Sequence, residues 1–194
     1  MIAAIVLAAG GSQRMGQPKQ LLPVGGQPMV GRVVDTVLAA GIEQVIVVLG
    51  SSANEVQRAL AGKPVTLIVN PHWQEGIASS LRAGLSPIVA QADAVLFVPA
   101  DMPRLSAPPI QAVVARFLST GKAIVAPTCN GRRGNPVLFA RPLFAELMRL
   151  RGDAGGRTLF AAHADDIELV EVGDEGILLD IDTPDEYDRM LRHW

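Results

Sequence analysis

Short apolar runs alternate along the chain with longer segments whose apolar positions recur at helical spacing. The short runs are rich in Val, Ile and Leu, which is typical of strands buried on both faces of a sheet. They predict strands at residues 2–7, 44–49, 65–69, 94–98, 123–126, 136–139, 167–172 and 177–179. The longer segments predict helices at residues 28–40, 53–61, 76–89, 107–119, 141–149 and 157–164. We therefore expect an α/β fold, a mostly parallel sheet with helices on both faces, with an added mixed or antiparallel portion after residue 120.

Length and composition are those of one well-packed globular domain, which we expect to span residues 1–194. Hydrophobic residues make up 49% of the chain, and no apolar run approaches the roughly 20 residues that span a bilayer. The N-terminus lacks a basic segment before its apolar run, so it reads as a first strand rather than a signal peptide. The single cysteine, Cys129, excludes an internal disulfide and a cysteine-based zinc site.

The formal net charge of −2 argues against broad binding to nucleic acid or to a membrane surface. We therefore expect neither as a partner. Together with the cysteine usage, this favours a cytoplasmic protein that acts on a small molecule.

The loop after the first strand carries the strongest chemical signal. The strand ends in a turn of small residues, Ala8–Ser12, and the cations Arg14 and Lys19 follow. Glycines let a backbone approach a ligand closely, and consecutive N–H groups in such a turn form an anion-binding concavity. The spacing matches neither a Walker A loop nor a dinucleotide-binding loop. The stretch predicts a polyphosphate site; the alternative is a tight connection with two solvated cations.

Three acidic residues are candidate metal ligands. Asp101 lies between Pro99 and Pro103 directly after a predicted strand, so its carboxylate is held rigidly, as suits Mg²⁺; a turn or helix cap is the alternative. Asp180 and Asp182 lie two residues apart, just before a helix that we expect to begin at Pro184 with an N-cap at the preceding threonine. One of these two carboxylates fits a capping role and the other a metal.

Two further loops have polar residues that fit ligand binding. The segment after the third strand carries Asn70 and Ser79, which suit contacts to a base or ribose, whereas Trp73 is expected to pack. Serines at a helix start are also ordinary caps. Arg132 and Arg133 suit a second anionic substrate or a solvated loop. Because ligands of open α/β sheets bind beyond the carboxyl ends of strands, we expect the loops at 8–19, 70–80 and 99–103 to form one site.

Six segments, in order along nearly the whole chain, carry a family resemblance: LAAGGSQRMGQPKQLLPVGGQPMV, NPHWQEGIASSLRAGL, PADMP, GRRGNPVLF, LRGDAGGRTL and DIDTPDEY. The first looks like the signature LAAGxSxRMGxxKxLLP of the molybdenum-cofactor nucleotidyltransferases. Among these, the chain is most similar to the CTP-using cytidylyltransferases, because the guanylyltransferases typically have Gly where this chain has Ala9. The chain departs from many members at Asn135, where they carry His.

The resemblance implies a Rossmann-like three-layer α/β/α nucleotidyltransferase fold and a Mg²⁺-dependent reaction. In that reaction the phosphate of molybdopterin, already carrying molybdenum, attacks the α-phosphate of CTP and releases pyrophosphate, and a molybdoenzyme receives the product. The implied nucleotide-binding residues are Leu7, Ala8, Ala9, Gly10, Gly11, Ser12, Arg14, Lys19, Asn70 and Ser79. Arg14, Lys19 and Asp101 are the implied catalytic residues, with Asp101 and Asp182 as metal ligands. The alternatives are a nucleotidyltransferase that uses GTP, UTP or a sugar or alditol phosphate, and a non-catalytic protein that delivers the cofactor.

Overall fold

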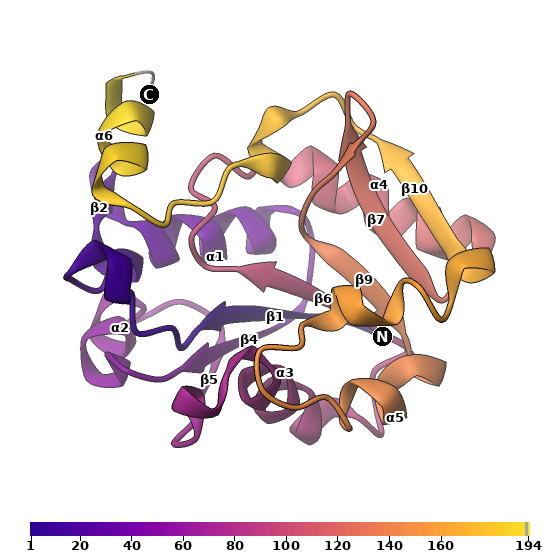
Figure 1. Cartoon of the computed structure of the whole chain (residues 1–194). Helices are drawn as coiled ribbons and strands as arrows, with labels where there is room; N and C mark the ends of the chain where they lie inside the picture. The colour runs from indigo at the N-terminus through magenta and orange to yellow at the C-terminus, as the bar shows by residue number, and fades with distance from the viewer. Residues whose placement is uncertain (193) are drawn as a thin grey trace.

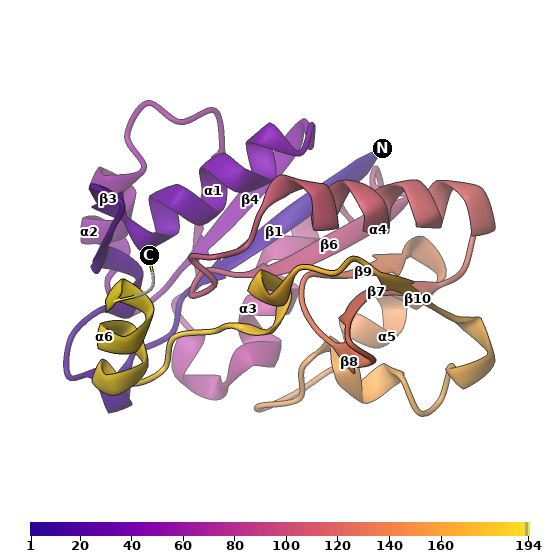
Figure 2. The ribbon, with the colours of Figure 1, turned by 90° about the horizontal axis from the view of Figure 1, so that it is seen from above.

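The computed structural model describes residues 1–192 and 194, and its centre is a sheet covered by helices on both faces (Figures 1 and 2). Within these residues eight strands form the sheet, in the order β10-β7-β9-β6-β1-β4-β5, with β8 paired to β7. The strands are β1 (Ile2–Ala8), β4 (Gln44–Leu49), β5 (Thr66–Val69), β6 (Ala94–Pro99), β7 (Ile124–Cys129), β8 (Arg132–Arg133), β9 (Val137–Ala140) and β10 (Ile167–Glu171). A separate hairpin joins β2 (Pro23–Val24) to β3 (Gln27–Pro28).

The sheet is parallel around β1 and turns antiparallel where the sequence spacing becomes irregular. β1 pairs in parallel with β4 on one side and with β6 on the other. β9 lies antiparallel between β6 and β7, because the chain returns from β7 through a short turn in which Asn130 and Gly131 have positive φ. Both the mostly parallel sheet and its added antiparallel portion are thus confirmed.

Two apolar layers enclose the sheet. The helices are α1 (Met29–Ala39), α2 (Ala53–Ala59), α3 (Ile77–Leu85), α4 (Ala107–Thr120), α5 (Phe144–Leu147) and α6 (Pro184–Arg192). The core that includes α1, α2 and α4 takes Ala4 and Val6 of β1, and the core that includes α3 and α5 takes Ala3 and Ile5. Side chains of a strand point alternately to its two faces, so a strand buried on both faces is apolar throughout. No helix within residues 1–192 and 194 is long and apolar enough to cross a membrane.

Two predicted elements are wrong in kind. The helix expected at 157–164 is a single 3-10 turn, Gly156–Leu159, followed by a turn. The strand expected at 177–179 is instead part of another 3-10 turn, Glu175–Leu178, where the carboxylate of Asp174 accepts a hydrogen bond from the N–H of Gly176 at 2.7 Å. That side chain offers the backbone an alternative to strand pairing, which periodicity does not reveal.

The C-terminal helix α6 returns to the N-terminal loop, beside β2 (Figure 1). The predicted N-cap is confirmed: Thr183 Oγ1 accepts a hydrogen bond from the N–H of Glu186 at 3.3 Å, and the Glu186 carboxylate accepts from the N–H of Thr183 at 2.9 Å. Met190 packs with Met15 in a small buried cluster, and the Tyr187 hydroxyl donates to a carbonyl of β2 at 2.6 Å. These contacts bring Asp182, two residues before the helix, to the loop that follows β1.

Candidate active site

The site lies where the chain order of the strands reverses. From β1 the sheet continues to β4 on one side and to β6 on the other, so the loops after β1 and β6 leave a crevice between them. The N–H of Ala100 donates to the carbonyl of Leu7 at 3.2 Å, which holds the two loops side by side. A cavity of about 530 Å³ opens there. Its lining residues are Leu7, Ala9, Gly10, Gly11, Gln13, Lys19, Gln20, Trp73, Gln74, Gly76, Ile77, Ser80, Pro99, Ala100, Asp101 and Asp153.

A buried glutamine that the sequence reasoning missed shapes the loop after β1. Gln20 is only 2% exposed, and its Nε2 donates to the carbonyls of Ala8 at 3.2 Å and Gly10 at 2.7 Å. Ser12 Oγ donates to Gln20 Oε1 at 3.3 Å and accepts from the N–H of Lys19 at 3.0 Å. The loop is therefore folded back on itself, with Lys19 fixed at its end. The only sequence signal was a glutamine next to the candidate lysine.

The glycine-rich turn is also needed for close packing. A Cβ on Gly11 would lie 2.8 Å from the Trp73 ring, closer than real Cβ atoms approach other atoms. Trp73 packs as the sequence analysis expected, partly buried against the core below α3. Gly11 therefore lets the loop after β1 and the loop after β5 meet at one wall of the cavity.

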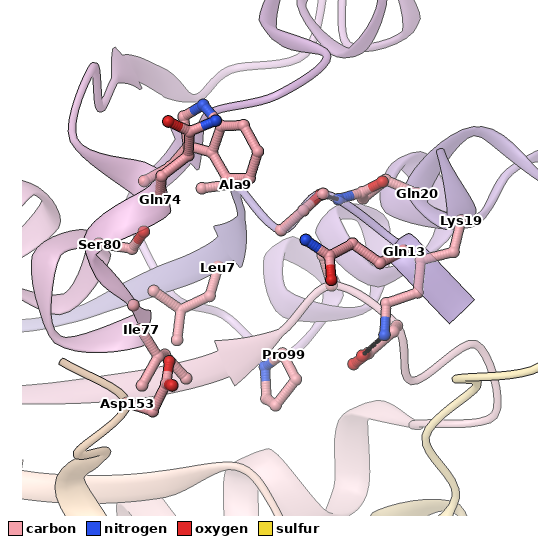
Figure 3. A pocket seen from close by; sticks show the side chains of 16 residues that line it. Leu7, Ala9, Gln13, Lys19, Gln20, Gln74, Ile77, Ser80, Pro99 and Asp153 are labelled. Carbon is pink, nitrogen blue, oxygen red and sulfur yellow. Dashed lines mark hydrogen bonds and ion pairs between the residues drawn. The ribbon is translucent and has the colours of Figure 1, made fainter. Parts of the chain in front are cut away.

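Four charged side chains from three distant segments meet beside the cavity. Lys19 Nζ donates to Asp101 Oδ2 at 2.5 Å, an interaction drawn as a dashed line in Figure 3, and to Asp182 Oδ1 at 2.6 Å. Arg14 donates to the other oxygen of Asp182 at 2.7 Å. Asp180, the alternative carboxylate in the sequence analysis, is exposed instead. The structure thus brings together the two cations and two carboxylates that the sequence singled out.

The cluster shifts the ionisation of its members. Burial alone would lower the pKa of Lys19, but Asp101 and Asp182 outweigh this effect and raise it above the ordinary value. Burial raises the pKa of Asp101, with the Lys19 ammonium opposing the rise. Burial also acts to raise the pKa of Asp182, but hydrogen bonds and charge from Lys19, helped by Arg14, hold it below its ordinary value. Lys19 is therefore protonated near neutral pH. The ionised form of Asp101 carries the free-energy cost of taking its charge out of water.

The donor set fits a hard divalent cation. Asp101 Oδ1 is buried and has no hydrogen-bond partner, which is costly for a carboxylate oxygen unless a ligand supplies one. Two carboxylates, Asp101 and Asp182, already lie around a single cation, the Lys19 ammonium. Mg²⁺ in nucleotide sites is usually held by one or two carboxylates together with substrate phosphates. The described residues hold no cluster of three or more metal-binding side chains, so phosphate ligands would have to complete the coordination.

Five of the residues that the sequence analysis assigned to the nucleotide do not line the cavity: Ala8, Ser12, Arg14, Asn70 and Ser79. Asn70 Nδ2 donates to the hydroxyls of Ser79 at 2.8 Å and Ser80 at 3.1 Å, and Asn70 is 3% exposed. Of these three, Ser80 reaches the cavity, and the sequence analysis did not select it. Asn70 and Ser79 therefore position the start of α3, and any direct contact to a nucleotide stays a prediction.

The wall opposite Lys19 comes from the start of α3 and the loop after α5. Figure 3 shows Ile77 and Asp153 across the cavity from Lys19. The loop is tied to the helix because the N–H of Ala78 donates to the carbonyl of Gly152 at 3.0 Å. The sequence analysis did not select Asp153, because its place at the cavity depends on contacts remote in sequence.

Replacement of Gly76 should unfold or distort this wall. Gly76 has φ of 98°, and a Cβ there would collide with the backbone carbonyl of Gly152. We expect Gly76→Ala to lower the free energy of unfolding by at least about 2 kcal/mol more than Gly62→Ala. Gly62 is the matched control, since its φ is 80° but its Cβ would meet no atom within 4 Å. Equal urea midpoints for the two variants would contradict the tight packing of this loop.

A mostly parallel α/β sheet with a glycine loop, two cations and two carboxylates at its switch point defines the nucleotidyltransferase class. The chain belongs to the family of the MobA-like NTP transferase domain, whose model matches residues 4–167. The fold is thus the nucleotidyltransferase fold that the sequence resemblance implied.

Relatives and solved structures resemble the chain over nearly its whole length. It is 30% identical to the molybdenum cofactor cytidylyltransferase of Escherichia coli (strain K12), over 96% of this chain and 93% of that protein. It is 29% identical to the nicotine blue oxidoreductase of Paenarthrobacter nicotinovorans, over 98% and 96%. The crystal structure of Rv0371c in complex with manganese, from Mycobacterium tuberculosis H37Rv, matches with a TM-score of 0.83, 30% identity, and coverage of 100% and 99%. The names of the two relatives denote different activities, so the substrate has to be argued from the site.

Proposed function

We propose that the protein transfers CMP from CTP to the terminal phosphate of molybdenum-bearing molybdopterin, forming molybdopterin cytosine dinucleotide and pyrophosphate with Mg²⁺. The observation that carries this proposal is the cluster of Lys19, Arg14, Asp101 and Asp182 beside the cavity. The E. coli cytidylyltransferase supports the choice of nucleotide and acceptor. On this proposal the protein works in the cytoplasm and passes its product to a molybdoenzyme.

The residues of the first loop bind and orient the nucleotide. Leu7 and residues 9–11 line the cavity, and the backbone of this stretch contacts the base and ribose, with Ala9 in place of the glycine typical of guanylyltransferases. Lys19 and Arg14 exchange carboxylate partners for the triphosphate, whose several charges attract them more strongly. Ser80 and Gln74 line the facing wall, where they can hydrogen-bond to the base.

Asp101 and Asp182 would hold the Mg²⁺, which screens the charge of the triphosphate when it is bound. The manganese in the Rv0371c structure supports a divalent metal in this fold. The unpartnered Asp101 Oδ1 and the Asp182 carboxylate supply hard oxygen donors without a third side chain. Asp101 follows the carboxyl end of β6, and the N–H of Ile181, next to Asp182, donates to the carbonyl of Asp101 at 3.0 Å, so both carboxylates lie beside the first loop.

The chemistry needs positioning and charge neutralisation rather than a general base. The attacking oxygen of the acceptor phosphate is already ionised; it forms a bond to the α-phosphorus while the bond to the bridging oxygen of the pyrophosphate breaks. The electron pair of that bond leaves on pyrophosphate, so negative charge grows on the leaving group. Lys19 and Arg14 face that charge, and preorganised cations of this kind are usually the largest catalytic contribution. This explains why no nucleophilic side chain is needed.

A nucleotide-selectivity assay tests the proposal. With molybdopterin as acceptor, we expect pyrophosphate release from CTP to exceed release from GTP, ATP or UTP at least tenfold in kcat/KM, and to require both acceptor and Mg²⁺. Sugar and alditol phosphates serve as competing acceptors, and nucleotide without acceptor is the blank. Preference for another nucleotide or acceptor would move the protein to a different transferase. Cofactor binding without pyrophosphate release from any nucleotide would instead indicate a delivery protein.

A further inference from the structure

The buried amide of Gln20 has no part in the charge chemistry proposed above. At 2%, its side chain is the least exposed of the buried polar side chains in the part of the chain that the structure describes. The signature LAAGxSxRMGxxKxLLP leaves the position of Gln20 open, so the family resemblance gives it no role either. Burial of a polar side chain costs free energy unless its hydrogen bonds are made. The bonds that this amide makes therefore indicate what it does.

Three consecutive carbonyls of the loop after β1 are occupied by donors from the protein. Gln20 Nε2 donates to the carbonyls of Ala8 at 3.2 Å and Gly10 at 2.7 Å. The carbonyl between them, of Ala9, accepts from the N–H of Ser51 at 3.2 Å. Ser51 Oγ also donates to the carbonyl of Gly10, at 2.9 Å. The direction of each of these peptide groups is therefore fixed in the protein without a ligand.

The fixed carbonyls determine where the N–H groups of the loop point. A trans peptide group is planar, and its N–H points opposite to its C=O. Because Gln20 holds the carbonyls of Ala8 and Gly10, the N–H groups of Ala9 and Gly11 point away from the buried amide. Neither N–H donates to another group within residues 1–192 and 194. Both residues line the cavity, so two free backbone donors are available there to an anionic oxygen.

The same amide is connected to the cation of the loop. Ser12 Oγ donates to Gln20 Oε1 at 3.3 Å and accepts from the N–H of Lys19 at 3.0 Å. Figure 3 shows Gln20 and Lys19 on the same side of the cavity, across from Ser80. An amide suits this place because it offers two N–H donors and an oxygen acceptor without a charge. A carboxylate would accept from N–H groups instead, and so would favour the opposite direction of the peptide groups.

We propose that Gln20 is a positioning residue for the polyphosphate of the nucleotide. Its amide holds the carbonyls of Ala8 and Gly10 away from the ligand. The N–H groups of Ala9 and Gly11 then donate to oxygens of the bound triphosphate without any rearrangement of the loop. Donors that are oriented in advance stabilise charge more strongly than donors that must first turn. The identity of the ligand rests on the proposed nucleotidyl transfer, whereas the direction of the peptide groups does not.

Calorimetric binding of inorganic tripolyphosphate tests this role without metal, base or turnover. Gln20→Met leaves an unbranched side chain in the loop but removes both donors, and should weaken the affinity about tenfold or more. Gln17→Met is the matched control, because Gln17 lies in the same loop but is exposed and does not line the cavity. Its affinity should equal that of the wild type. No binding by the wild type, equal affinity in Gln20→Met, or equal weakening in the control would overturn the proposal.

Amide resonances distinguish a positioning role from a merely structural one. In the full-length, ¹⁵N-labelled wild type, saturating tripolyphosphate should shift the amide signals of Ala9 and Gly11. Gln20→Met should lose these shifts even at saturation, whereas Ser12→Ala, which keeps both bonds from Gln20 Nε2, should retain them. If Gln20 only stabilised the fold, the shifts at saturation would be the same in Gln20→Met. Unshifted signals of Ala9 and Gly11 in the saturated wild type would overturn the proposal without any variant.

CMP transfer separates this role from the proposed function. We expect Gln20→Met to lower kcat/KM for CTP about tenfold or more, with the KM for molybdopterin as in the wild type. If the wild type releases no pyrophosphate from any nucleotide but its amide shifts depend on Gln20, the transfer reaction is refuted and the positioning role stands. If the wild type transfers CMP and Gln20→Met equals it in kcat/KM and in tripolyphosphate affinity, the role of Gln20 is refuted and the transfer reaction stands.

Discussion

Asp101→Asn should lower kcat/KM for CMP transfer by about 10³-fold or more, because this carboxylate is the buried one of the pair that faces the triphosphate. The amide keeps the shape of the side chain but loses its charge, and it presents a donor towards the Lys19 ammonium. Pyrophosphate release at several Mg²⁺ concentrations measures the loss. Near-normal, Mg²⁺-dependent turnover by the folded variant would refute the metal assignment.

The same substitution should leave the fold intact. Because burial raises the pKa of Asp101, the ionised carboxyl costs folding free energy at every pH above its unfolded pKa. That cost grows as the pH rises towards the folded-state pKa, and Asn removes it. We expect a free energy of unfolding near pH 7 equal to or above that of the wild type, from urea melts. Asp165→Asn, at an exposed carboxylate that does not line the cavity, should change neither turnover nor stability.

Lys19→Met should have opposite effects on catalysis and on metal binding. Loss of the ammonium removes a cation that faces the leaving pyrophosphate, so kcat/KM should fall about 10²–10³-fold. The same ammonium lies 2.5 Å from Asp101 and 2.6 Å from Asp182, where it repels a dication. Without nucleotide, we therefore expect Mn²⁺ to bind the variant about tenfold more tightly than the wild type. Paramagnetic resonance of free Mn²⁺ measures this directly.

Lys63→Met is the control for a lost ion-paired lysine, because Lys63 pairs with Asp35 on α1 and does not line the cavity. It should alter neither Mn²⁺ affinity nor turnover. If Lys19→Met weakened Mn²⁺ binding, the ammonium and the metal would not compete for the same carboxylates. If it left kcat/KM unchanged, the role of Lys19 towards the triphosphate would be refuted.

The parts of the site that follow strand ends could be read from the sequence. The loop with Lys19 and the loop with Asp101 follow two parallel strands, and the carboxyl ends of such strands share one edge of the sheet. The local pattern did not separate Asp180 from Asp182; only the family resemblance implied Asp182. The choice between them depends on the packing of α6 against the first loop, 163 residues away from Lys19 along the chain.

The remaining misses also arise from tertiary contacts. Gln20 and Asp153 act through hydrogen bonds and packing that no local periodicity encodes. The segment expected as helix 157–164 forms one 3-10 turn because Gly156 must lie against the Phe139 ring, where a Cβ would be 2.6 Å away. Local pattern predicts the elements, whereas long-range contacts decide how short segments bend between them.

The docking of α6 sets the order in which the parts of the site form during synthesis. During synthesis the loop with Arg14 and Lys19 leaves the ribosome well before Asp182, which lies 163 residues after Lys19. Until then, Arg14 lacks the partner that it has in the finished protein, and Lys19 has only one of its two. The sheet and its two main cores need no residue of α6, whose buried contact is in a separate small cluster. A nascent chain can thus form the sheet and its two main cores first, and the charged cluster is completed only when Asp182 and α6 dock against the first loop.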